Sequence, residues 1–221
     1  MTELALTFKC AHLNLEGRLH LPAEDRGKVP GVVLCHPHPL YGGNMHNNVI
    51  LAVCHSLNTA GIAALRFNFR GVGSSGGHFD NGDGEQDDAR AALTVLAERQ
   101  EIAAGRLGVM GYSFGGMVTL AMGRNNERVK ALAAVSPVLI PGILQGVNKP
   151  VFFISGSDDH VVAPQALFRE VAGMELPGKV EVVQMADHFW WGHEDNVGRK
   201  LAAFFTEALW DKGTGPLSHL G

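Results

Sequence analysis

Apolar positions follow two different periods along this chain. Six short runs are apolar at nearly every position and predict strands buried on both faces, at 29–35, 62–67, 107–111, 129–135, 150–155 and 180–185. Between them, apolar residues recur every three or four positions and predict helices near 49–60, 164–172 and 197–209, and a further helix with a buried stripe at Ala92, Val95 and Leu96. The run from 117 to 122 is apolar nearly all round and predicts a central helix. Strands that alternate with helices predict an α/β fold, a mostly parallel doubly wound sheet with helices on both faces.

The first residues show a different pattern from the rest of the chain. Residues 4–21 alternate between apolar and polar positions around Glu16-Gly17, which predicts one or two antiparallel strands at the sheet edge. At the other end, residues 213–221 have no periodicity and predict a flexible tail. Because we find no repeat and no linker, we expect residues 1–221 to form a single domain.

Individual residues mark where three of the helices begin or end. Gly61 is a suitable stop for the helix before it, and Pro164 suits the first turn of a helix. Asp83 with Gln86 resembles a capping box, which predicts Asp83 as the N-cap of the helix behind it. These signals divide the chain into elements of ordinary length.

Composition narrows the class of partner. The chain has 221 residues, 46% of them hydrophobic, and a net charge of −4 without a basic block, so nothing indicates nucleic acid. No apolar run reaches membrane-spanning length, and the first residues do not resemble a signal peptide. Cys10, Cys35 and Cys54 are an odd number without metal-like spacing, and we expect reduced, buried thiols in a cytoplasmic protein.

The sequence Gly111-Tyr112-Ser113-Phe114-Gly115 joins a predicted strand to a predicted helix. Gly-x-Ser-x-Gly in this setting is typical of a nucleophile elbow, in which a sharp turn holds a serine hydroxyl at the end of the sheet. The turn also presents the backbone N–H of Phe114 at a helix N-terminus, where it can stabilise an oxyanion.

A serine nucleophile needs a base and a group that orients the base. The loop after 150–155 contains Asp158 and Asp159, and the loop after 180–185 contains Asp187 and His188. The carboxyl ends of parallel strands lie at one edge of a sheet, so we expect both loops beside Ser113. The order serine, acid, histidine is that of the α/β-hydrolase fold.

With these residues in view, the chain resembles the α/β-hydrolase superfamily. It is similar in particular to small serine hydrolases with an HPHP loop, which are dienelactone-hydrolase-like or esterase-like. The resemblance covers residues 4–210 and rests on five motifs, at 35–43, 66–73, 111–115, 156–159 and 186–189. It implies that Ser113 is the nucleophile, His188 the general base and acid, and Asp159 the orienting carboxylate. Asp158 is the rival for the acid; the superfamily pattern Gly-x-x-Asp-x-x-Val favours Asp159, and we expect Asp187 to be structural or solvated.

The loop after 29–35 carries the second oxyanion donor in this fold. Pro37 and Pro39 have no N–H, so the donor is His38 or a later residue such as Leu40, and we favour His38. His36, His38, His46 and His55 could suggest a metal site, but prolines alternate with His36 and His38, and no carboxylate or cysteine lies at ligand-like spacing beside that pair. We therefore expect no metal and no cofactor.

The glycine-rich segment Gly71-x-Gly73-x-x-Gly76 follows a predicted strand and spells a dinucleotide fingerprint. We reject that interpretation because the residues after it continue as loop rather than opening a helix. The related hydrolases often have Asp where this chain has Asn68, which leaves the hydrogen bonding of Arg70 open. Trp190 and Trp191 fit equally well as residues at the substrate rim or as core aromatics.

The segment 137–149 is too short for a helical cap, so we expect no sizeable cap domain and an open, shallow site. These features favour a carboxylesterase that cleaves small or short-chain esters through an acyl-enzyme on Ser113. The alternatives are a peptidase, thioesterase or lactone hydrolase with the same triad. A non-catalytic binding protein is a further alternative. The expected partner is a small-molecule ester.

Overall fold

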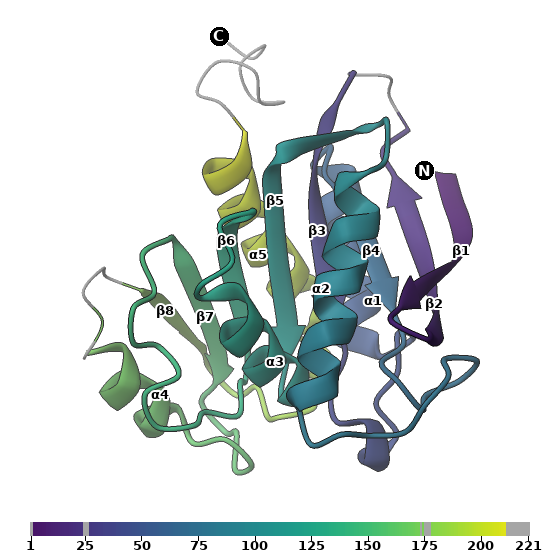
Figure 1. The fold of residues 1–221 in the computed structure, drawn as a ribbon. Helices are drawn as coiled ribbons and strands as arrows, with labels where there is room; N and C mark the ends of the chain where they lie inside the picture. The colour runs from purple at the N-terminus through teal and green to yellow at the C-terminus, as the bar shows by residue number, and fades with distance from the viewer. Residues whose placement is uncertain (1, 24–26, 173, 175–177, 211–221) are drawn as a thin grey trace, which may run out of the picture.

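The structure is a computed structural model that describes residues 2–23, 27–172, 174 and 178–210. One eight-stranded sheet runs through the molecule in the order β1-β2-β4-β3-β5-β6-β7-β8 (Figure 1). The strands are β1 Thr2–Cys10, β2 Leu13–Leu21, β3 Val29–Cys35, β4 Ala63–Phe67, β5 Ile102–Tyr112, β6 Val129–Val135, β7 Val151–Gly156 and β8 Lys179–Val183. The tail predicted at 213–221 lies outside the described residues, and the single domain stays a prediction.

Strand directions agree with the predicted topology. Neighbouring strands from β4 to β8 pair in parallel, whereas β1 pairs with β2 and β2 with β4 in antiparallel register. The N-terminal alternation therefore forms two edge strands. The predicted fold class, a mostly parallel sheet with an antiparallel N-terminal edge, is confirmed.

Helices cover both faces of the sheet, which explains why every residue of β3 and β4 is buried (Figure 1). On one face lie α1 Asn48–Thr59 and α5 Glu194–Leu209, which pack against each other and against one apolar core. On the other face lie α2 Asp83–Ala97, α3 Phe114–Gly123 and α4 Pro164–Val171, over the second core. The helices thus cover the two faces of the sheet, and the edge at which the parallel strands end is left for a functional site.

The start of α2 corrects the predicted capping box. The N-cap is Gly82, and Glu85, not Gln86, supplies the carboxylate that accepts from the Gly82 N–H at 2.8 Å. Gln86 instead donates from its amide to the carbonyl of Gly82. Gly82 has a φ of 101°, a conformation that only glycine adopts easily, so the cap falls one residue earlier than the spacing indicated.

The connection between β6 and β7 contains only turns. Residues 137–149, all of them described, form no helix or strand. The predicted absence of a sizeable cap is confirmed, and the edge of the sheet near Ser113 stays uncovered by an inserted domain. In the part of the chain that the structure describes, no helix is both long and apolar enough to cross a membrane.

Candidate active site

Ser113 lies between β5 and α3 with φ 55° and ψ −117°, a strained conformation for a residue other than glycine. The backbone folds back on itself here so tightly that its flanking glycines are required. A Cβ on Gly111 would lie 2.0 Å from the carbonyl oxygen of Gly115, and a Cβ on Gly115 would lie 2.3 Å from that of Cys35. Steric exclusion therefore explains the Gly-x-Ser-x-Gly spacing.

The structure brings together three of the predicted site residues. Nε2 of His188 lies 3.0 Å from Oγ of Ser113, and Nδ1 of His188 lies 2.9 Å from Oδ2 of Asp159. Because a carboxylate only accepts, Nδ1 carries the proton and Nε2 is free to accept one from the serine hydroxyl. The three residues are all buried, which strengthens these contacts by excluding water.

Asp159, rather than its neighbour Asp158, faces the histidine. Oδ1 of Asp159 also accepts from the amides of Val161 at 3.0 Å and Val162 at 2.7 Å. Burial opposes ionisation of this carboxyl, but the hydrogen bonds from His188 and from the backbone outweigh it and hold its pKa below the ordinary value. The exposed Asp158 accepts from the hydroxyl of Ser157 at 2.7 Å and has no hydrogen bond to His188.

Asp187 has a local structural role, as expected from its position beside the histidine. Its Oδ1 accepts from the amides of Phe189 at 2.9 Å and Trp190 at 3.0 Å. The side chain therefore shapes the turn that carries His188 and makes no contact with the imidazole among the described residues.

Two backbone amides are candidates for the oxyanion hole. Phe114 is the first residue of α3, and among the described residues its amide has no hydrogen-bond acceptor. The same is true of the His38 amide within the described part of the loop after β3. The amide of Leu40 donates to Nδ1 of His38 at 3.2 Å. Since this contact occupies the Leu40 amide, the geometry favours His38 as the second donor.

His36 is a buried support for this loop. Its Nδ1 donates to the carbonyl of Pro37 at 2.7 Å, while Nε2 accepts from the amide of Phe69 at 3.1 Å. Burial lowers the pKa of His36 to about 4, so the ring is neutral. Among the described residues, no three His, Cys, Asp or Glu side chains come together in a metal-binding arrangement.

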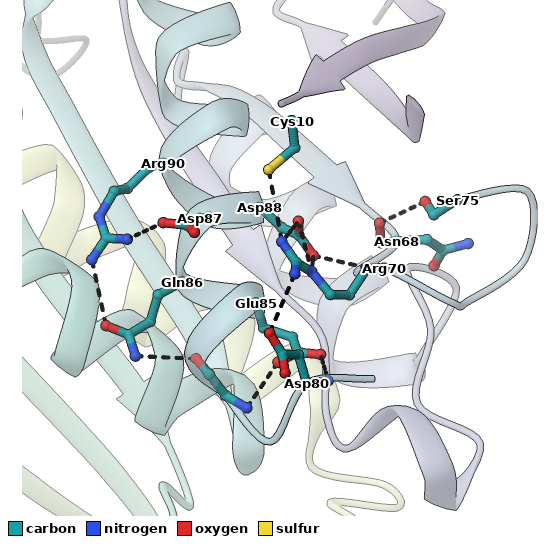
Figure 2. A network of polar contacts seen from close by, with 11 residues as sticks. Cys10, Asn68, Arg70, Ser75, Asp80, Glu85, Gln86, Asp87, Asp88 and Arg90 are labelled. Atoms are coloured by element: carbon teal, nitrogen blue, oxygen red, sulfur yellow. Dashed lines mark hydrogen bonds and ion pairs between the residues drawn. The ribbon is translucent and has the colours of Figure 1, made fainter. Parts of the chain in front are cut away.

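The glycine-rich loop after β4 is held by Arg70, as Figure 2 shows. The guanidinium makes a two-pronged contact with Asp88, 2.9 Å from Nη2 to Oδ1 and 3.1 Å from Nε to Oδ2, and lies 3.5 Å from Asp80. Asn68 instead accepts from the amide of Met45 at 2.7 Å, so it does not replace the absent aspartate at Arg70. The question left open by the sequence is thus answered by a partner on α2.

The same region shows why the loop is unsuitable for a dinucleotide. Helix α2 begins only at Asp83, well after Gly76. The buried carboxylate of Glu85 accepts from the amides of Asp80 and Gly82 at the helix N-terminus (Figure 2). A negative side chain therefore already holds the donors that a pyrophosphate would need.

A cavity of about 470 Å³ opens over Ser113. Apolar and aromatic side chains dominate its wall, and the residues that line it are Pro37, His38, Tyr41, Gly42, Gly43, Asn47, Tyr112, Ser113, Phe114, Val138, Val161, His188 and Phe189. Several of them are exposed at the mouth, with Tyr41 87% and Phe189 56% exposed. The two tryptophans left open by the sequence do not line it: Trp190 is fully buried and Trp191 is 71% exposed.

Comparison with known proteins agrees with this geometry. A solved structure from Xanthomonas campestris, described as an α/β serine hydrolase without lid, has a TM-score of 0.85 at 30% identity, covering 95% of this chain and 96% of that one. An α-β serine hydrolase homologue from Coxiella burnetii has a TM-score of 0.84 at 29% identity, covering 92% of this chain and 97% of that one. The fold and these structures define a lidless α/β serine hydrolase, which confirms the resemblance read from the sequence.

The family can be given more narrowly. A family model described as serine aminopeptidase, S33, matches residues 30–149. An uncharacterized protein of Rickettsia prowazekii (strain Madrid E) is 33% identical over 172 residues, which cover 73% of this chain and 72% of the relative. The chain belongs to this S33 serine aminopeptidase family of α/β hydrolases.

Proposed function

We propose that the protein is a serine carboxylesterase in which Ser113 is the nucleophile, His188 the general base and acid, and Asp159 the orienting carboxylate. The observation that carries the proposal is the hydrogen-bonded chain Ser113–His188–Asp159 at the base of an open, apolar cavity. The membership of this chain in a serine hydrolase family supports the proposal.

Acyl transfer follows from the geometry in two halves. In the first, Nε2 of His188 takes the Ser113 proton, Oγ bonds to the ester carbonyl carbon, and the alcohol leaves with the proton from the histidine. In the second, water loses a proton to His188 and its oxygen bonds to the acyl carbon. The bond from this carbon to Oγ then breaks, His188 returns the proton to Ser113, and the acid is released. The amides of Phe114 and His38 stabilise the oxyanion of both tetrahedral intermediates, an effect of about 3 kcal/mol per donor.

The open cavity favours small or short-chain esters. The described residues form no cap over it, and its exposed mouth leaves a long acyl chain in water rather than in an apolar tunnel. We expect nitrophenyl acetate and butyrate to be turned over faster than nitrophenyl laurate. Faster turnover of the laurate would contradict this preference.

Labelling with a fluorophosphonate tests the nucleophile directly. The wild-type protein should become labelled on Ser113, and Ser113→Ala should lose both the label and ester hydrolysis. The exposed Ser74 provides a matched control, because Ser74→Ala removes a hydroxyl that does not line the cavity over Ser113. Labelling of Ser113→Ala at the wild-type rate would contradict the proposal that Ser113 is the nucleophile.

A peptidase is the second candidate, because the matching family is described as serine aminopeptidase. An aminopeptidase must bind the positive amino terminus of its substrate, for which a carboxylate is the usual partner. None of the described residues that line the cavity is Asp or Glu, which favours a neutral ester instead. Comparing an amino-acid nitroanilide with nitrophenyl butyrate separates the two, and we expect the ester to be cleaved far faster.

A further inference from the structure

The loop that carries His188 runs over residues 184–193, between β8 and α5, and two buried side chains from other strands hold it. The hydroxyl of Tyr112 donates to the backbone carbonyl of His188 at 2.5 Å. The indole Nε1 of Trp190 donates to Oγ of Ser136 at 3.2 Å, at the end of β6. Neither contact is one of the hydrogen bonds that join Ser113, His188 and Asp159 to one another.

Tyr112 is the residue immediately before the nucleophile, so its hydroxyl joins the elbow to the histidine by a second route. It is 3% exposed, and burial together with the nearby Asp159 and Asp187 raises its pKa. The hydroxyl therefore stays protonated and donates. Its ring also packs against the imidazole of His188, with ring centres 5.6 Å apart.

Trp190 anchors the far side of the same turn. It has a φ of 63°, which is unfavourable for a bulky side chain, so the surroundings must hold the conformation. The side chain is fully buried, and its N–H is bonded to Ser136, whose own amide donates to Ile154 of β7. The loop conformation thus depends on the ends of two central strands.

We propose that Tyr112 is a positioning residue, which with Trp190 fixes the backbone of His188 so that Nε2 meets Ser113 and Nδ1 meets Asp159. The inference rests on the proposed function for its catalytic consequence. Because displacement of a catalytic group by about 1 Å costs on the order of 100-fold in rate, removing the tether should be visible in turnover.

Trp191 provides the control for the test, because it lies on the same loop as His188, is 71% exposed and does not line the cavity. Tyr112→Phe removes the hydroxyl bonded to His188, while Trp191→Phe changes an exposed aromatic side chain of the same loop. We expect kcat for nitrophenyl butyrate to fall about 10- to 100-fold in Tyr112→Phe with KM changed less than about twofold. Trp191→Phe should keep the wild-type kcat.

A second readout does not need ester hydrolysis. The Nδ1 proton between His188 and Asp159 gives a low-field proton resonance when the imidazole is held in place. This resonance should broaden or vanish in Tyr112→Phe and persist in Trp191→Phe. If the wild type cleaves no ester but the resonance behaves in this way, the proposed function fails and the positioning role stands.

Trp190→Phe provides a second test in case the Tyr112 variant fails to fold. It removes the indole N–H bonded to Ser136 but leaves Tyr112 and the Ser136 hydroxyl, which also hydrogen-bonds Asp159. We expect Trp190→Phe to weaken the same resonance and lower kcat about 3- to 10-fold at nearly constant KM. Unchanged kcat and an unchanged resonance in folded Tyr112→Phe would overturn the proposal. If that variant does not fold, wild-type behaviour of Trp190→Phe on both measures would overturn it.

Discussion

The base and the mouth of the cavity obey different physical constraints. At the base, Ser113, His188 and Asp159 are each at most 8% exposed, and their polar atoms are bonded to one another. At the mouth, Tyr41 and Phe189 are more than half exposed. The difference indicates that the chemistry depends on steric and hydrogen-bond geometry, whereas substrate choice depends on side chains that few neighbours hold in place.

The strongest test of the geometry at the base of the cavity compares Asp159 with its exposed neighbour Asp158. Asp159→Asn should lower kcat/KM for nitrophenyl butyrate about 10⁴-fold, because an amide in this place favours the wrong histidine tautomer. Asp158→Asn, one residue away and exposed, should change it less than about twofold. Equal losses in the two variants would show that the base is not organised as the structure indicates.

The elbow should also be far less tolerant of a methyl group than Gly105, an exposed position of β5. In Gly115→Ala the new Cβ would meet the carbonyl oxygens of Cys35 at 2.3 Å and His36 at 2.4 Å. We expect the free energy of unfolding in urea to fall by at least about 3 kcal/mol. Gly105→Ala, where a Cβ meets nothing within 4 Å, should stay within about 0.5 kcal/mol of wild type.

Acid should lower the free energy of unfolding through the buried His36, which supports the loop after β3. The pKa of His36 is about 4 in the fold against an ordinary 6.5, so the unfolded chain binds its proton first and stability is lost as pH falls from 6.5 toward 4. Between pH 7 and pH 5 we expect a loss of about 2 kcal/mol from this group in urea unfolding. Burial lowers the pKa of His20 and His38 as well, which adds to the loss with the same sign.

A variant separates the His36 contribution from the others. His36→Gln should be less stable than wild type at pH 7 but should lose about 2 kcal/mol less on going to pH 5. The exposed His55→Gln should keep the wild-type pH dependence. An identical pH dependence in all three proteins would remove His36 as the cause.

The smallest effects should come from the mouth. Phe189→Ala should lower kcat/KM for nitrophenyl butyrate about fivefold more than for the acetate, because it removes apolar surface beside the longer acyl chain. Trp191→Ala truncates a neighbouring exposed aromatic that does not line the cavity and should leave this ratio unchanged. A similar change in both variants would indicate a general surface effect.

Much of the fold could be read from the chain because its determinants are local. Two-sided apolar runs such as 29–35 became β3, buried throughout, and the alternating residues 4–21 became the two edge strands. The first and last residues of individual strands and helices were predicted less accurately. The predicted strand at 180–185 ends at Val183. The N-cap of α2 is Gly82 because of the backbone conformation of this glycine, which a pattern of residue spacing does not show.

By itself, the sequence determined the order of elements, the elbow at Ser113 and the two loops beside it, since glycine sterics and apolar periodicity act between near neighbours. Only the tertiary structure decided which of two adjacent residues faces inward. Asp159 and Trp190 are buried while Asp158 and Trp191 are exposed, and the amide of Leu40 is occupied by the His38 ring. The bonds from Tyr112 to His188 and from Arg70 to Asp88 join positions 76 and 18 residues apart. Such pairings follow from how strand ends and helices meet in space, which no local pattern encodes.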